Sequence, residues 1–277
     1  MCLLYQGKYE FSWRCNYARE LSYAAQYQQA KEQIILASSS SSSKVDSLQL
    51  YYTTAELYYE MENYQIAVEN YERAININPN YSEAKFKLSL VYLRKENFSK
   101  GWKNYEGRMK INRADVNQKS MLTLNQWNGE KFKGTLYVRG EQGVGDQILH
   151  SSMIADLYRI HSDICLVIDD RLVSMFNRSF KKIKIVGYSK DLKFGQDDKH
   201  ILIGSLGKIL RKSFNDFQEK PLPYIIPDQK KCDEYKKILL QNKKIKVNAR
   251  EPLKLRPWVS PRLCYVSGPT AIISGHI

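Results

Sequence analysis

Two acidic side chains enclose a glycine-rich stretch near the middle of the chain, Glu141-Gln-Gly-Val-Gly-Asp146. A carboxylate on a rigid turn can act as a general base when a substrate hydroxyl lies within hydrogen-bond reach. Glycines allow close approach, so Gly143 and Gly145 could bring backbone N–H groups near a phosphate or sugar. Asp146 is therefore the candidate general base, and Glu141, Gln142, Gly143 and Gly145 are candidate substrate-binding residues. The competing interpretation is that Asp146 is a helix N-cap and Glu141 a solvated loop carboxylate.

This stretch needs a strand before it and a helix after it. Residues 135–139 are short, apolar and mostly β-branched or aromatic, which favours a buried strand. The glycines predict a tight turn that needs positive φ or close backbone approach, and Asp146 stands at the expected N-cap of a helix over 148–160. Such a turn lies at the carboxyl end of a parallel strand, where α/β folds bind ligands.

Strand-like and helix-like segments alternate through the rest of 134–247. The pattern predicts a parallel, doubly wound, Rossmann-like sheet in this range. We expect strands over 164–169, 183–186, 200–204 and 244–247, helices over 171–180, 205–212 and 230–241, and an extended linker over 221–227.

The N-terminal part has a different, helical periodicity. Residues 48–81 place Tyr, Ala and Pro at the spacing of a tetratricopeptide repeat, and 82–115 continue the register without the terminal proline. Small residues at Ala55 and Ala67 allow two antiparallel helices to approach closely, while Tyr58 and Tyr71 fill the space between them.

At least three stacked repeats are usually needed to bury a continuous core. Ala30, Ile34 and Ala37 indicate a degenerate earlier repeat, separated from the next by a polyserine loop over 38–43. Residues 7–13 are read as the second helix of a still earlier unit. We therefore expect a helical-repeat arm over 1–115, followed by a connector over 116–133.

A repeat arm normally presents a concave face built from the first helix of each pair. The functional interpretation of this face is a binding site for a peptide or a partner helix, and the competing one is packing or simple solvation. The candidate protein-binding residues are Gln49, Tyr52, Glu56, Tyr59, Glu83, Phe86, Leu90 and Leu93.

Three motifs together resemble a known family. They are G-W-x-x-Y-E-x-R at 101–108, W-x-G at 127–129 and E-Q-G-x-G-D at 141–146. In this order the chain resembles bacterial proteins that join tetratricopeptide repeats to a heptosyltransferase-like glycosyltransferase domain of the two-lobed GT-B type, over roughly residues 48–247. The resemblance implies that the first lobe holds the acceptor, that a second lobe holds a nucleotide-sugar, and that Asp146 is the general base.

The chain departs from that family after Val247. Residues 248–277 hold four of the eight prolines and have no periodicity, so we expect an irregular, disordered tail in place of the second lobe. The predicted fold class is α plus α/β: a tetratricopeptide arm, one Rossmann-like parallel lobe and this tail. The expected protein is a truncated glycosyltransferase-like chain, inactive alone, that binds a protein and takes a sugar or glycan acceptor. The alternative is a repeat scaffold for protein interaction without catalysis.

Bulk composition restricts the remaining classes. The five cysteines and four histidines are scattered, which predicts a reduced, cytoplasmic protein with no metal site and no cofactor. The net charge of +14 comes mostly from dispersed lysines without a DNA-binding or RNA-binding motif, so we do not expect a nucleic-acid partner. No apolar run approaches bilayer length, and none predicts a membrane span.

Overall fold

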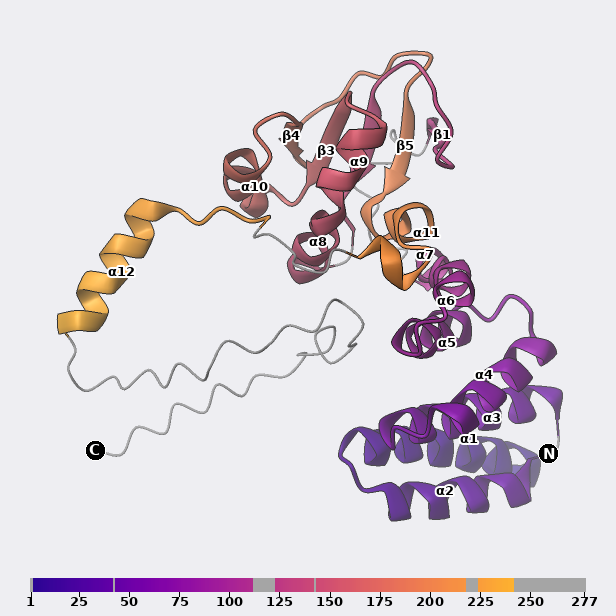
Figure 1. Ribbon diagram of the computed structural model, residues 1–277. Helices are drawn as coiled ribbons and strands as arrows, with labels where there is room; N and C mark the ends of the chain where they lie inside the picture. The colour runs from indigo at the N-terminus through magenta and orange to yellow at the C-terminus, as the bar shows by residue number, and fades with distance from the viewer. Residues whose placement is uncertain (1, 42, 112–122, 142, 218–223, 242–277) are drawn as a thin grey trace. The chain divides into compact units, whose positions relative to one another are not determined.

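The computed structural model describes residues 2–41, 43–111, 123–141, 143–217 and 224–241 (Figure 1). The expected strand over 244–247, the tail over 248–277 and the candidate residue Gln142 lie outside these ranges. The chain divides into two compact units, Met1–Val116 and Asn117–Ile277. They are called the arm and the α/β unit below, and each is described by itself.

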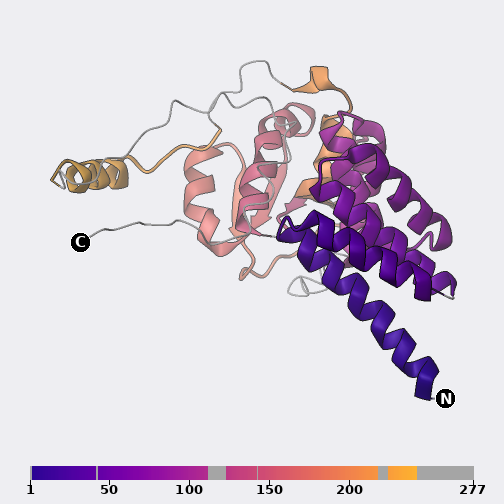
Figure 2. The same ribbon diagram turned by 90° about the horizontal axis from the view of Figure 1, so that it is seen from below.

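The arm consists of helix pairs (Figures 1 and 2). The first helix of each pair packs against the second, and each pair packs against the next. The pairs are α1 (Cys2–Tyr23) with α2 (Tyr27–Ser40), α3 (Lys44–Glu60) with α4 (Tyr64–Ile77), and α5 (Ser82–Arg94) with α6 (Phe98–Tyr105), followed by the short α7 (Arg108–Ile111). The helical-repeat prediction is therefore confirmed.

One turn recurs between the two helices of every pair. Ala25, Glu62 and Glu96 all have φ near +60°, a conformation that non-glycine residues rarely adopt. The next backbone N–H in each case reaches back five residues to a carbonyl, as in Asn63 to Tyr58 at 2.9 Å and Asn97 to Tyr92 at 2.8 Å. The three turns are spaced by 37 residues and then by 34, and the longer first spacing goes with α3, which has 17 residues where α5 has 13.

Small residues hold the helices of the second pair together, as the sequence predicts. Ala55, Ala67 and Ala74 have no exposed surface, and Tyr71 fills the space between them. The side chains of Asn63 and Asn97 accept hydrogen bonds from the first turns of α4 and α6, which provides the N-caps. Gln26 makes no such bond before α2, in keeping with a degenerate first repeat.

Two expectations for the N-terminal region are wrong. Residues 7–13 do not form the second helix of a separate repeat, because they belong to α1, the first helix of the pair completed by α2. The serines before α3 are not an unstructured loop either. Ser38, Ser39 and Ser40 end α2 with hydroxyl groups bonded to carbonyls one turn earlier, and Ser43 caps α3 through a reciprocal bond with Asp46.

The α/β unit contains a parallel sheet with strand order β1-β5-β2-β3-β4. Its central registers place Val138 opposite both Leu166 and Ile201. The strands are β1 (Asn125–Gln126), β2 (Leu136–Arg139), β3 (Ile164–Ile168), β4 (Lys184–Gly187) and β5 (Lys199–Leu202). The helices are α8 (Val144–His150), α9 (Ile154–Ile160), α10 (Val173–Ser179), α11 (Gly207–Leu210) and α12 (Gln229–Gln241). One parallel α/β lobe is thus confirmed.

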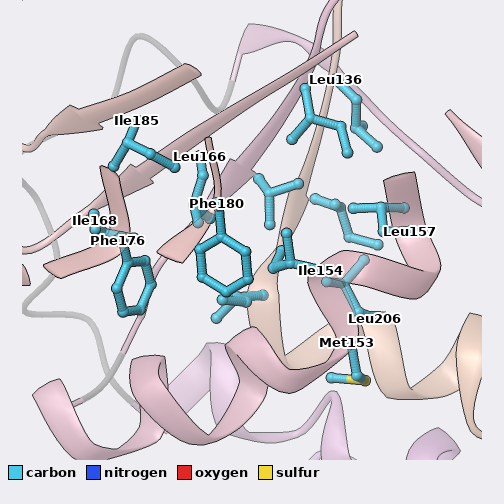
Figure 3. Packing of buried hydrophobic residues seen from close by; sticks show 14 of the residues in the cluster. Leu136, Met153, Ile154, Leu157, Leu166, Ile168, Phe176, Phe180, Ile185 and Leu206 are labelled. Atoms are coloured by element: carbon cyan, nitrogen blue, oxygen red, sulfur yellow. The ribbon is translucent and has the colours of Figure 1, made fainter. Parts of the chain in front are cut away.

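The two faces of the sheet are covered differently. Leu136, Leu166 and Ile185 face a core supplied by α9, α10 and the segment before α11, including Ile154, Leu157, Phe176 and Leu206 (Figure 3). The opposite face packs against loop side chains, mainly Leu192 and Phe194 from the β4–β5 connection. The doubly wound expectation is therefore wrong for the described residues, because residues 188–198, which include three Asp and two Lys, form no helix.

Part of the expected connector belongs to the sheet. Asn125 and Gln126 pair with β5, and Trp127 is 2% exposed within the main core. The indole N–H of Trp127 donates to the carbonyl of Glu130 at 2.7 Å, which satisfies the only polar atom of the buried ring. No described helix is both long and apolar enough to cross a bilayer.

Candidate functional site

The carboxyl ends of β5, β2 and β3 lie next to one another in the sheet. Ligands of parallel α/β folds bind beyond this edge. Several polar side chains are buried here or just beyond: Arg139, Glu141, Gln147, His150 and Ser205 are each at most 6% exposed. A group of buried polar residues is unusual where apolar packing would suffice, so this edge is the candidate substrate site of the α/β unit.

Asp146 lies in the first turn of α8 but not at its cap. The helix begins at Val144, earlier than expected, and Gly143 takes the N-cap position. The backbone N–H of Gly143 donates to Asp146 Oδ2 at 3.1 Å, so one carboxylate oxygen ties the turn to the helix. The side chain is half-buried, and its role as a general base stays a prediction.

The glycines of the turn serve different purposes. Positive φ among the described glycines occurs at Gly129 and Gly134, so of the two expected reasons for glycine in this turn, positive φ does not apply. Close approach accounts for Gly140, where a Cβ atom would lie 2.6 Å from Gln147 Oε1. A Cβ on Gly145 would meet no atom within 4 Å. Gly145 therefore has open space beside it, in a helical turn that an alanine would stabilise.

Glu141 is not a solvated loop carboxylate. It is 6% exposed, and its Oε1 accepts the backbone N–H of Gly204 at 3.0 Å, which joins the end of β2 to the end of β5. Gln147 makes the corresponding link to β3, because its Oε1 accepts the N–H of Asp169 at 3.0 Å. The sequence reading missed Gln147 and His150, although two polar residues at i and i+3 in a half-apolar helix were a usable signal.

Asp169 presents a carboxylate just after β3. The side chain of Arg171 donates to both of its oxygens at 2.8 Å, and the backbone N–H of Arg171 adds a third bond. These hydrogen bonds lower the pKa of Asp169 to about 2. Among the described residues, no three His, Cys, Asp or Glu side chains are placed to hold a metal ion. Burial raises the pKa of the Cys15 and Cys165 thiols to about 11, which makes both poor nucleophiles.

The second candidate site is the face of the arm formed by α1, α3 and α5, which we call the inner face. The predicted residues on it differ in exposure. Glu83 is exposed, Gln49, Tyr59, Phe86 and Leu93 are half-buried, and Tyr52, Glu56 and Leu90 are buried. A Cβ on Gly101 would lie 2.6 Å from a Leu93 methyl group, so Leu93 is used for packing between α5 and α6.

Glu56 is the centre of the inner face. It is 1% exposed and bonds to residues of all three helix pairs. Tyr23 Oη from α1 and Lys87 Nζ from α5 each lie 2.9 Å from Glu56 Oε2, and the Tyr71 hydroxyl donates to Oε1. The side chain of Lys87 also lies about equally far from two aromatic rings, 5.9 Å from the Tyr23 centroid and 6.0 Å from that of Tyr59.

The phenols around Glu56 have perturbed acidities. Burial is the main cause, and the Glu56 carboxylate adds to it by disfavouring a second negative charge. The pKa values of Tyr23, Tyr52 and Tyr71 are raised well above the ordinary value of 10.0. The sequence did not single out Tyr23 or Lys87. For Tyr23 the reason is the spacing of 37 residues between the first two turns, which hid the relation between α1 and α3.

One comparison with known proteins supports the helical repeats of the arm. A family model described as TPR repeat matches residues 55–95, from the middle of α3 to the end of α5. No curated protein sequence matches the chain. Among solved structures, a mutant O-GlcNAc transferase of Thermobaculum terrenum is similar with 10% identity and a TM-score of 0.35, over 59% of this chain and 38% of that one. That TM-score is too low to support an inference about activity.

Proposed function

We propose that the arm binds a peptide or helical segment of a partner protein on its inner face. The observation that carries this proposal is the convergence of α1, α3 and α5 on Glu56, which makes the three helix pairs one surface. Tetratricopeptide repeats, to which residues 55–95 are similar, generally serve protein interaction. The partly exposed aromatic rings of Tyr59 and Phe86 would supply apolar contact area.

The predicted face residues then divide by role. Gln49, Tyr59, Glu83 and Phe86 have surface that a partner can contact. Tyr52, Glu56 and Leu90 are buried, so they contribute to the packing of the arm and not to the surface that a partner contacts. Truncating Tyr59 and Phe86 removes contact area that a partner can use. Both rings also pack on tyrosines of the arm, Tyr64 and Tyr105, so circular dichroism melts of the variant accompany the binding test.

The test uses the full chain and a displayed peptide library. Peptides selected by the parent chain are measured by fluorescence anisotropy against the double variant Tyr59→Ala with Phe86→Ala. We expect binding to weaken at least about tenfold, as for loss of interface hot spots. Tyr17→Ala, on an exposed part of α1, is the matched control. Failure of the parent chain to select any peptide, or equal binding by the double variant, would contradict the proposal.

A second function is favoured by the open space beside Gly145. We infer that the α/β unit binds a sugar or glycan acceptor at the carboxyl edge of its sheet, as the resemblance to heptosyltransferase-like enzymes implies. Asp146 would take the proton of the acceptor hydroxyl while that oxygen bonds to the sugar carbon and the nucleoside diphosphate leaves. The nucleotide-sugar would need a second lobe, which is not among the described residues, so we propose no turnover by the described parts alone.

A glycan array probed with the full chain tests this second function. Asp146→Asn keeps a hydrogen-bond acceptor for the Gly143 N–H and removes the base, so it should retain glycan binding and lose any transfer. Gly145→Ala should reduce glycan binding, because a methyl group would occupy the open space. No glycan bound by the parent chain, or equal binding by Gly145→Ala, counts against an acceptor site at this turn.

The proposed setting is a reducing compartment such as the cytoplasm. Cys15, Cys165 and Cys232 are free thiols, and Cys15 and Cys165 are buried. Thiol labelling of the protein freshly isolated from its cells would check this point: disulfide-linked cysteines would contradict it.

A further inference from the structure

Arg19 occupies a distinctive position on the inner face. The repeated turns at Ala25 and Glu62 relate α1 to α3 by 37 residues, and this shift places Arg19 where Glu56 stands in the next pair. Both residues therefore belong to the same row of the inner face. Arg19 is half-buried, and its positive charge acts on the phenols of Tyr23, Tyr52 and Tyr81.

The guanidinium of Arg19 lacks an acceptor among the residues that the structure describes. Its Nε–H is buried without a hydrogen-bond partner. A buried donor left unpaired destabilises a protein, and the penalty is larger for a charged group. Lys87, the other cation of this surface, differs because Glu56 neutralises it at 2.9 Å. Arg19 is thus a cation of the inner face whose Nε–H has no acceptor among the described residues, so a negatively charged group of a ligand could pair with it.

The surroundings of Arg19 suit an anion carried by a peptide. Tyrosine rings from three segments flank it, and Tyr52 lies with its ring centroid 5.1 Å from that of Tyr81. Arginine matches the planar geometry of a carboxylate, while neighbouring rings provide apolar contact for the rest of a peptide residue. The carboxylate of Glu56 is already occupied by two phenols and Lys87.

The inner face continues on both sides of Arg19. Toward the N-terminus of α1, Ser12 bonds to Gln49 of α3 at 3.4 Å, and toward its C-terminus Tyr23 bonds to Glu56. A peptide bound along this face would therefore extend beyond Arg19 on both sides. The anion that reaches Arg19 is then a side chain within the peptide rather than its end.

We propose that Arg19, with Tyr23, Tyr52 and Tyr81, forms an anion subsite that accepts an Asp or Glu side chain of the bound peptide. This inference rests on the proposed peptide-binding function of the arm and adds the chemistry of the partner. A charge-assisted hydrogen bond between Arg19 and the peptide carboxylate would give the inner face a preference for acidic partners.

The experiment compares library selections by full-length variants. The parent chain should enrich Asp or Glu at one internal position of the selected peptides. Arg19→Gln should lose that enrichment, and Arg19→Glu should enrich Lys or Arg at the same position. For one selected peptide, changing the acid to its amide should weaken binding about tenfold or more to the parent chain and much less to Arg19→Gln. Arg73→Gln, an exposed arginine of α4, is the matched control.

The possible outcomes distinguish this inference from the proposed peptide-binding function on which it rests. If the parent chain selects peptides without an acidic preference, the subsite is refuted while peptide binding stands. If it selects no peptide, the proposed function fails first. Peptides that bind only through a free C-terminal carboxylate, and not when amidated there, would overturn the assignment to a side chain. Circular dichroism melts of the Arg19 variants exclude unfolding as the cause of any loss.

Discussion

The arm and the α/β unit each bury a glutamate, and they satisfy it in different ways. Glu56 is held by side chains: two phenols and an ammonium group from α1, α4 and α5. Glu141 accepts a backbone N–H at the start of the segment after β5. A backbone donor is present whatever the side chain at that position, whereas a side-chain donor depends on residue type. The Glu56 contacts therefore depend on the identities of distant residues, whereas the bond between Glu141 and Gly204 does not depend on the side chain at position 204.

The same contrast appears in the tyrosines. Six phenols of the arm have raised pKa values, mainly through burial: Tyr23, Tyr52, Tyr59, Tyr71, Tyr81 and Tyr92. In the described part of the α/β unit, Tyr137 and Tyr224 share this direction. The arm therefore has more tyrosine hydroxyl groups that must stay protonated for the folded state to be stable. This difference gives the first and largest test of the comparison.

Raising the pH should unfold the arm before the α/β unit. A phenol whose pKa is higher in the folded state than its ordinary value of 10.0 contributes stability that is fully present below pH 10 and is lost as the pH rises further. Stability falls with rising pH because the phenols of the unfolded chain lose their protons at a lower pH than those of the folded chain. We expect hydrogen exchange, measured by mass spectrometry after brief exposure to pH values from 9 to about 11.5, to show loss of protection in α3, α4 and α5 first. Earlier loss in β2 and β3 would reverse the comparison.

Glu56→Ala should be the most damaging single change. It leaves Lys87 and two phenols without their shared acceptor, which is itself 1% exposed, and removing one partner of a buried ion pair costs about 3–5 kcal/mol. Urea unfolding followed by circular dichroism gives the free energy of unfolding. Glu83→Ala, which removes an exposed glutamate of the same face, is the matched control and should cost less than about 0.5 kcal/mol. Equal effects of the two changes would show that Glu56 is no structural centre.

Glu141→Ala should cost less than Glu56→Ala. The change removes the acceptor of the Gly204 N–H, and a hydrogen bond to a charged group contributes about 1.5–3 kcal/mol. The same urea measurement applies, with exchange of the Gly204 amide as a local readout. If Glu141→Ala proves the more harmful of the two, side-chain donors are not what distinguishes the arm.

Much of the arm could be predicted from sequence because its signal is local and repeated. Ala55, Ala67 and Tyr71 recur at fixed offsets, and packing of two helices requires small and large residues at those positions. The role of α1 could not be predicted in the same way, since the spacing of 37 residues between the first two turns departs from the 34 between the next two. Glu56 was therefore assigned to a partner-binding face, while its actual partners Tyr23 and Lys87 went unnoticed.

The sheet edge was harder to predict for a different reason. The strand at 136–139 follows from its apolar run, but which strand ends meet depends on the order β5-β2-β3, and no local pattern encodes strand order. The sequence consequently left Glu141 as either a substrate-binding residue or a solvated loop carboxylate, and it did not indicate the bond to Gly204. Helices cover only one face of the sheet because residues 188–198 lack helical periodicity. The regular alternation of strands and helices elsewhere led to the prediction of helices on both faces.

The smallest effect is expected at glycines, and it has opposite signs in the two regions. Gly101→Ala should destabilise the arm by about 1–3 kcal/mol, because its Cβ would lie 2.6 Å from Leu93 Cδ2 and 2.7 Å from Cγ. Gly145→Ala should stabilise the α/β unit by up to about 1 kcal/mol, since its Cβ meets no atom within 4 Å and alanine favours the first turn of α8. Urea unfolding of both variants measures the two signs. If Gly145→Ala destabilises the protein, the glycine is needed for folding, and the open space beside Asp146 loses its value as evidence for an acceptor site. If it stabilises the protein while glycan binding falls, the glycine is retained at the expense of stability, which is the pattern expected of a residue kept for a ligand.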